Sequence, residues 1–302
     1  MNYSQRIQNF QNFIKEQDLD ACIIDNCTDI YYLTGLSLSV GQIFISPFTA
    51  QLFVDGRYIE NCQQYSPIES RISKNDALFS FINSQKNPSK KLGFDQNTMT
   101  YAAHDRFSKK IQKYCPQGIH IIPLSSPLES LRSIKDADEI QLLKKSADLG
   151  TKGFHLAWSL LKEGITEKYL AQEIEIFWKK EGAEKPAFEI NVSFGKNSAM
   201  PHHRAGDSVL QEHDIVLIDM GVCLNKYNSD MTRTVFFGEG DAELQKIYHI
   251  VEEAQLASLE LCKAGLLIET LDKTSRDLIT QAAYGEYYTH SLGHGIGLEV
   301  HE

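Results

Sequence analysis

Three residues in the second half of the chain have the types and spacing of a metal site. Asp219 follows the apolar run 215–218, where an unpaired buried carboxylate would cost several kcal/mol. Asp230 comes just before a second extended run, so a hairpin of 214–222 with 231–237 would bring the two carboxylates side by side. His294 adds an imidazole. Such an oxygen-and-nitrogen set suits manganese, cobalt, zinc or iron better than calcium.

Two simpler interpretations of these carboxylates stay open. Asp219 can also be an aspartate that caps the end of a strand. Facing carboxylates repel unless a cation lies between them, and Arg233 is a candidate for that cation. The metal interpretation and the arginine interpretation therefore make different predictions about where Arg233 points.

The remaining candidate residues are histidines. His290, His294 and His301 alternate with glycines in the segment 288–302, and glycine allows the backbone to approach a ligand closely. A second group, His202 and His203, follows Pro201 in a predicted loop, where residues that contact substrate often lie. Both segments are expected to line a metal or substrate site.

The first part of the chain predicts an α/β domain. Apolar residues recur at helical spacing within 3–17, and short apolar runs predict strands at 21–25, 42–46, 51–55, 91–95 and 119–123. Further helices are expected at 57–64, 76–84 and 101–114. These elements alternate in the manner of an open sheet covered by helices.

The second part has a different order of elements and predicts an α+β arrangement. A long amphipathic helix up to Gly164 and a helix at 166–181 come first, followed by extended segments at 188–194, 214–222 and 232–237. Helices at 241–264 and 269–283 precede the histidine segment. We place the boundary near residue 130, which gives domains 1–130 and 131–302.

Composition excludes two classes of partner. Thirty Lys and Arg against forty Asp and Glu give a net charge of −10, which disfavours nucleic acid and anionic membranes. The first residues lack the apolar core of a signal peptide, and no window approaches the roughly 18 apolar residues of a membrane span. We expect a cytoplasmic protein.

Several motifs together resemble one family. The first part carries the stretches 28–35 and 55–58, the junction carries 131–135, and the second part carries 197–202, 219–221, 229–234 and 290–302. In this order and spacing they resemble the pita-bread metallopeptidases, in the branch of the Xaa-Pro aminopeptidases and Xaa-Pro dipeptidases (prolidases). The resemblance implies an α/β creatinase-type N-terminal domain followed by an α+β pita-bread catalytic domain.

The resemblance also implies roles for individual residues. It implies that Asp219, Asp230 and His294 are ligands of a centre with two divalent metal ions, manganese first and cobalt or zinc as alternatives. His202 matches a histidine that contacts substrate or moves a proton near the scissile bond. His290 and His301 match histidines that line the substrate pocket, and His301 is counted with His202 as catalytic. The implied substrate is a peptide with proline in second position, and the implied assembly is a homodimer.

The family supplies two further glutamate ligands beyond the point where this sequence stops, at Glu302. We therefore expect a catalytic domain that is incomplete at its C-terminus, with weak metal binding and low activity. Two alternatives follow: a non-catalytic pita-bread module for binding or dimerisation, and a metal-independent hydrolase of the creatinase type. The combination of Asp219, Asp230 and His294 disfavours the second.

Overall fold

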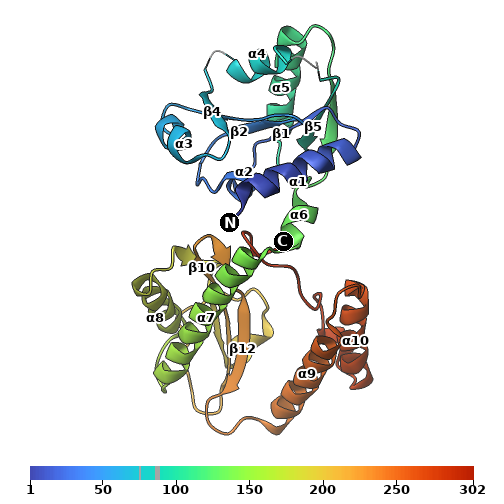
Figure 1. The fold of residues 1–302 in the computed structure, drawn as a ribbon. Coiled ribbons are helices and arrows are strands. Elements are labelled where there is room, and N and C mark those ends of the chain that lie inside the picture. The colour runs from blue at the N-terminus through green and yellow to red at the C-terminus, as the bar shows by residue number, and fades with distance from the viewer. Residues whose placement is uncertain (75, 86–88) are drawn as a thin grey trace. The chain divides into compact units, whose positions relative to one another are not determined.

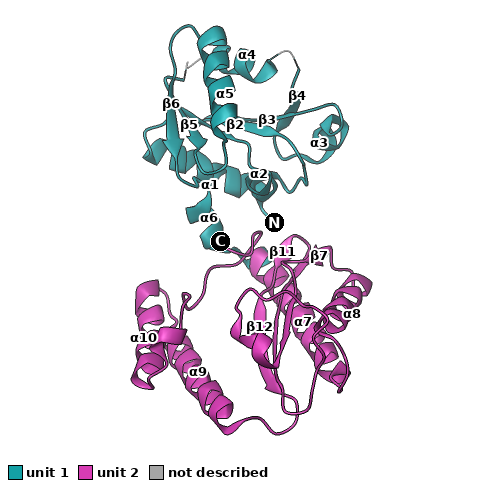
Figure 2. Cartoon of the chain, turned by 180° about the vertical axis from the view of Figure 1, so that it is seen from behind, with its two compact units in different colours: residues 1–138 teal, residues 139–302 magenta. Residues whose placement is uncertain are grey.

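The computed structural model describes residues 1–74, 76–85 and 89–302, which form two compact units (Figure 2). The units are Met1–Asp138 and Glu139–Glu302, whereas the sequence analysis placed the boundary near residue 130. The short helix α6 (Glu129–Ser133) belongs to the first unit, because its buried Arg132 donates from Nη1 to Asp29 Oδ1 at 2.8 Å. Unit 2 begins within the long helix α7 (Ala137–Leu160).

Unit 1 is built on one six-stranded sheet with the order β4-β3-β2-β1-β5-β6 (Figure 1). Strands β1 and β2 and strands β2 and β3 pair antiparallel, while β3–β4, β1–β5 and β5–β6 pair parallel. The strand bounds are Ala21–Ile24, Gln42–Ile45, Ala50–Val54, Glu69–Ile72, Lys91–Asp95 and His120–Leu124 for β1 to β6.

Helices cover both faces of this sheet (Figure 1). Their bounds are Tyr3–Glu16, Cys27–Thr34, Ile59–Tyr65, Ala77–Asn83 and Tyr101–Tyr114 for α1 to α5. On one face Phe79 of α4 and Phe107 of α5 pack with Phe44 and Phe53 of the sheet in a buried cluster. The predicted α/β organisation of this part is confirmed; β4, α2 and α6 were not predicted, since each is short and lacks a clear apolar period.

Unit 2 contains two three-stranded antiparallel sheets, with the orders β12-β9-β8 and β11-β10-β7. The bounds are Lys185–Pro186, Asn191–Phe194, Ile215–Met220, Val222–Leu224, Tyr227–Asn228 and Met231–Phe236 for β7 to β12. A single residue, Gly221, separates β9 from β10, so the chain passes directly from one sheet to the other. The short strands β7, β10 and β11 were not predicted.

Four helices complete unit 2: α7, α8 (Glu167–Lys180), α9 (Ala242–Leu261) and α10 (Ile268–Gln281). Trp178 of α8 packs in the buried core with Ile218 and Val192, and its indole Nε1 donates to the Leu149 carbonyl of α7 at 3.0 Å. Helices α9 and α10 pack against each other (Figure 1). Within the described residues, none of the helices combines the length and the apolar character needed to cross a bilayer.

Candidate metal centre

The predicted hairpin exists, and it sets the position of the two carboxylates. Strand β9 pairs antiparallel with β12, with Asp219 directly opposite Thr232, whose Oγ1 donates to Asp219 Oδ1 at 2.8 Å. Asp230 lies two residues before Thr232, so it is the diagonal neighbour of Asp219 on the same face. The carboxylates are therefore neighbours, although Thr232 rather than Asp230 is the direct cross-strand partner.

The surroundings of Asp219 disfavour its charged form. Burial raises the pKa of the Asp219 carboxyl, and the negative charge of Asp230 raises it further. The hydrogen bond from Thr232 and the positive charge that His202 can carry act in the opposite direction, but the net pKa stays above its ordinary value. Two carboxylates placed this way are stabilised by any cation that lies between them.

Arg233 does not supply that cation. It stands opposite Ile218, one residue out of step with Asp219, and its Nη1 donates to the Thr232 carbonyl at 2.8 Å. Among the described residues no ion pair joins Arg233 to either carboxylate. The arginine interpretation of the Asp219–Asp230 pair is therefore wrong.

Gly221 allows the two carboxylate-bearing segments to approach each other. A Cβ placed on Gly221 would lie 2.1 Å from the Ser229 carbonyl oxygen and 2.6 Å from the Phe188 ring, which is closer than real Cβ atoms come. Next to it, the Ser229 amide donates to the Val222 carbonyl at 2.9 Å. Glycine is required here by the close approach of two backbones rather than by an unusual φ angle.

His294 is paired with Asp230. Its Nε2 lies 3.3 Å from Asp230 Oδ2, and its Nδ1 lies 2.9 Å from the Gly295 carbonyl oxygen. A carbonyl can only accept, so Nδ1 carries the hydrogen and the lone pair of a neutral ring is on Nε2, facing the carboxylate. Two electron-pair donors that face each other need a proton or a metal ion between them. The chemistry of this donor set therefore fits a divalent transition metal.

His301 lies against His294, with the two ring centroids 4.1 Å apart. The surrounding terminal histidine segment, residues 288–302, has no helix or strand. Buried Asn228 holds it: the side-chain Nδ2 donates to the Gly297 and Leu298 carbonyls at 3.1 and 2.9 Å. The Asn228 backbone amide also donates to the Gly297 carbonyl at 2.9 Å, so both the side chain and the backbone of β11 hold the segment that carries His301.

His290 begins the same segment and is held differently. Arg276 of α10 donates to the carbonyls of Tyr288 and His290 at 2.8 and 2.9 Å, while Asp272 accepts from the Leu292 amide at 2.8 Å. The Arg276 guanidinium also pairs with Asp272, Nε to Oδ2 at 3.0 Å. We call this half-buried pair the Asp272–Arg276 clamp.

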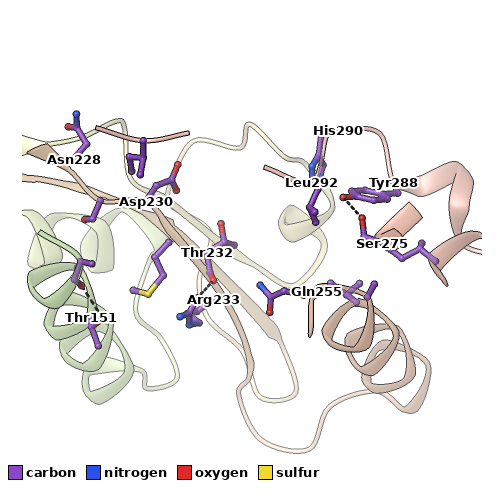
Figure 3. Close-up of a pocket in the computed structure, with 18 of the residues that line it drawn as sticks. Thr151, Asn228, Asp230, Thr232, Arg233, Gln255, Ser275, Tyr288, His290 and Leu292 are labelled. Carbon is purple, nitrogen blue, oxygen red and sulfur yellow. Dashed lines mark hydrogen bonds between the residues drawn. The ribbon is translucent and has the colours of Figure 1, made fainter. Parts of the chain in front are cut away.

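A cavity of about 1300 Å³ separates His290 from the hairpin. Figure 3 shows Asp230 and Thr232 on the hairpin side and Tyr288 and His290 on the side of α10. Ile140, Leu143 and Ala147 of α7 and Ile247 and Val251 of α9 give the cavity apolar walls. A mainly apolar cavity with a few polar groups at opposite ends is typical of a site for an organic ligand.

His202 is exposed in the loop between η1 (Gly195–Ala199) and β9. It lies close enough to Asp219 for its charge to lower the pKa of that carboxyl. His203, which the sequence analysis grouped with His202 but for which the family resemblance implied no role, turns to the protein interior and lies 2.8 Å from Glu167 Oε2 through its Nε2. The two adjacent histidines therefore point to different places: His202 is exposed near Asp219, and His203 contacts the buried Glu167.

The structure brings the predicted residues together only in part. His294 contacts both Asp230 and His301, and Asp219 lies near Asp230 and His202, whereas His290 is across the cavity. Over residues 1–74, 76–85 and 89–302, no three His, Cys, Asp or Glu side chains come close enough together to hold a metal ion. The donor types fit a metal, but the three donors do not converge in this conformation.

Sequence reasoning missed Glu167, the buried carboxylate that holds the His202 loop. It is the first residue of α8 and directly follows Thr166, whose Oγ1 caps the helix by accepting from the Tyr169 amide. One signal was present: Glu167 lies on the same helical face as the buried Leu170, Ile174 and Trp178. A glutamate on an apolar face needs buried donors.

Comparison with known proteins decides the family. Residues 141–302 match the family model of metallopeptidase family M24, and residues 6–134 match that of the creatinase/prolidase N-terminal domain. The chain belongs to metallopeptidase family M24. The predicted fold, a creatinase N-terminal domain followed by a pita-bread catalytic domain, is confirmed. Membership in M24 implies divalent metal ions and a hydrolase.

Individual M24 relatives resemble the chain over nearly its whole length. An Xaa-Pro dipeptidase from Pyrococcus furiosus is 32% identical over 300 residues, covering 99% of this chain and 83% of the relative. Among solved structures, an Xaa-Pro dipeptidase from Bacillus anthracis has a TM-score of 0.92 at 34% identity, covering 100% of this chain and 84% of that one. A prolidase from Pyrococcus horikoshii has a TM-score of 0.89 at 32% identity, with coverages of 99% and 84%.

Proposed function

We propose that this M24 chain hydrolyses the peptide bond between an N-terminal residue and a proline in second position. The similarity to Xaa-Pro dipeptidases and a prolidase supports this substrate class. The observation that carries the proposal is the arrangement of metal-binding groups at the hairpin. His294 Nε2 lies 3.3 Å from Asp230 Oδ2, and Asp219 is the neighbour of Asp230 on the hairpin. In this proposal Asp219, Asp230 and His294 hold the metal, with manganese as the native ion.

The bound metal supplies an activated water and polarises the substrate carbonyl. The protein's own residues supply position and proton transfer. His202, exposed beside Asp219, can accept or donate a proton near the scissile bond, because an imidazole can act as a general base or a general acid. His301, whose ring is tilted against that of His294, and His290, which lines the cavity, are proposed to contact the substrate. The apolar wall of the cavity that His290 lines suits a proline ring.

The test combines metal content with peptide cleavage. Purified chain loaded with manganese is assayed on a Leu-Pro dipeptide, with Leu-Ala as comparison, and metal per chain is measured by mass spectrometry. We expect cleavage of Leu-Pro that chelation abolishes. Asp219→Asn and His294→Ala should each lower metal content and reduce kcat/KM by more than about 100-fold, since loss of even an outer-shell partner costs about 10- to 100-fold.

Asp148→Asn is the matched control, because it removes the same charge from an exposed position on α7. It should leave both readouts unchanged. Full activity after exhaustive chelation would favour the metal-independent creatinase-type hydrolase instead. Absence of cleavage by a chain that holds metal would contradict the proposal. Loading with cobalt or zinc in parallel tests the choice of manganese.

Two wider proposals accompany this function. A homodimer is proposed from the family resemblance, and sedimentation velocity at several concentrations tests it. A cytoplasmic location is proposed from the composition, and fractionation of the source cells tests that.

A further inference from the structure

Glu167 is the first residue of α8, and its side chain is fully buried. Its carboxylate accepts hydrogen bonds from four donors. Its Oε1 accepts from the Phe194 amide and from Asn197 Nδ2, both at 2.8 Å. Its Oε2 accepts from the Gly206 amide at 3.1 Å and from His203 Nε2 at 2.8 Å. Hydrogen bonds to a charged acceptor are roughly twice as strong as those between neutral groups.

All four donors belong to one short stretch of chain. Phe194 ends β8, Asn197 lies in η1, and His203 and Gly206 follow the exposed His202. We call residues 195–206 the His202 loop. The carboxylate therefore ties both ends of this loop, and two side chains within it, to a single point on α8. The backbone adds to this attachment, since the Lys168 amide donates to the Gly206 carbonyl at 2.9 Å.

A second contact links the loop to the strand that carries Asp219. Asn191 Nδ2 donates to the carbonyl of Pro201, the residue before His202, at 3.3 Å. Asn191 is the cross-strand partner of Asp219 in the pairing of β8 with β9. The Pro201 backbone, next to His202, is therefore held by the residue that pairs directly with Asp219, and His202 lies near the Asp219 carboxylate.

We propose that Glu167 and His203 are positioning residues, which hold the His202 loop so that the exposed imidazole of His202 stands beside Asp219. The role of His202 in the reaction rests on the proposed function, but the attachment of the loop does not. In this proposal the two histidines have separate roles. His203 donates to Glu167, and its neighbour His202 lies near Asp219.

Ionisation of Glu167 supports this geometry. Burial raises the pKa of the Glu167 carboxyl, but the hydrogen bonds from Asn197, His203 and two backbone amides outweigh burial and hold the pKa below its ordinary value. An ionised carboxylate has only acceptor atoms, which matches four converging donors.

The test uses Glu167→Gln, which keeps the shape of the side chain but turns an amide NH₂ toward two of the donors. The control is Glu163→Gln, an exposed position just before α8. Hydrogen exchange measured by mass spectrometry should become faster in residues 195–206 of Glu167→Gln and stay unchanged in β9 and β12. On Leu-Pro, kcat should fall by roughly 10- to 100-fold, with KM and metal content changed less than about threefold, because misplacing a reacting group by an ångström costs about 100-fold.

A pair of substitutions at His203 provides an independent readout. His203→Gln retains a side-chain N–H donor for Glu167 and should restore most of kcat, whereas His203→Leu should reproduce the defect. This pair decides the question if Glu167→Gln does not fold. A purely structural role would lower folding stability in both variants without separating their kcat values.

Each result bears on one of the two proposals. Unchanged exchange in residues 195–206 of Glu167→Gln overturns the positioning role, as does equal kcat for the two His203 variants. Loss of metal content in parallel with kcat also overturns it. If the wild-type chain holds metal and does not cleave Leu-Pro, the proposed function fails, but faster exchange confined to 195–206 still supports the attachment of the loop by Glu167.

Discussion

The His202 loop and the terminal histidine segment both present histidines, but they are held by opposite means. The loop is tied to a carboxylate with no exposed surface, Glu167. The segment is held by the Asp272–Arg276 clamp, whose side chains are 28% and 38% exposed, and by Asn228. One attachment is a fully buried carboxylate, whereas the other combines a half-buried ion pair with neutral hydrogen bonds.

This difference predicts that the two attachments contribute different amounts to stability and respond differently to salt. A buried carboxylate is shielded from salt, and removing it leaves one buried and three half-buried donors without this acceptor, which is costly. An exposed ion pair contributes little and is screened by salt. The His202 loop should therefore be fixed relative to the hairpin, while the terminal histidine segment can adjust its position. Such adjustment is what His294 needs if it is to converge with Asp219 and Asp230 on a metal.

The largest effect is expected for Glu167→Ala. Removing the carboxylate leaves four donors without their acceptor, so the free energy of unfolding of unit 2 should fall by about 2 to 4 kcal/mol. Urea unfolding followed by tryptophan fluorescence measures this, because both tryptophans, Trp158 and Trp178, lie in unit 2. Glu163→Ala should change the free energy by less than about 0.5 kcal/mol. A loss below about 1 kcal/mol for Glu167→Ala would remove the contrast between the two attachments.

Acid should weaken the same attachment. The pKa of Glu167 is lower in the folded chain than its ordinary value of 4.5, so the unfolded chain binds the proton more readily. The stabilisation is complete above the unfolded pKa and is lost as the pH falls through the folded pKa. Urea midpoints measured from about pH 6 down to about pH 3 should decline more steeply for wild type than for Glu167→Gln. Parallel declines would show that the pKa of Glu167 is the same in the folded and the unfolded chain.

An intermediate effect is expected for Asn228→Ala in the terminal histidine segment. Loss of two hydrogen bonds from a buried amide should lower the free energy of unfolding by about 1 to 2 kcal/mol. Hydrogen exchange should become faster in residues 295–302 and stay unchanged in 195–206. Gln172→Ala, at an exposed position of α8, is the control. Faster exchange in both segments would mean that they are coupled rather than held separately.

The smallest effect is expected for Asp272→Asn. Exchange in residues 288–292 should increase by less than about tenfold at low salt, because exposed ion pairs contribute little. At about 1 M salt the wild type and the variant should become alike. Asp277→Asn removes the same charge from the same helix, where it pairs with Lys273, and should have no effect on this segment. A salt-independent difference would show that the amide contact from Leu292 matters more than the charge.

The sequence was sufficient for features that depend on local pattern. The apolar run 215–218 and the extended run after Asp230 indicated a hairpin, and with it the neighbouring positions of Asp219 and Asp230. The apolar runs predicted β1, β2, β3 and β5 within a residue of their observed bounds. The motifs predicted the family.

Features that depend on contacts between distant residues were not predictable in the same way. Glu167 contacts residues up to 39 positions away, and nothing in its neighbours specifies those partners. Asp272 and Arg276 are four residues apart and read as an ordinary surface pair, although both also bind the backbone of 288–292. The roles of these residues depend on which distant segments fold back against them, and the local pattern of apolar residues does not specify this.

The site is sensitive to any side chain added at Gly221. The separation of the Asp219 and Asp230 segments is limited there by the close approach of Gly221 to the Ser229 carbonyl and to the Phe188 ring. A single added methyl group at position 221 should therefore push the two segments apart, and with them the carboxylates of Asp219 and Asp230 in the proposed metal centre.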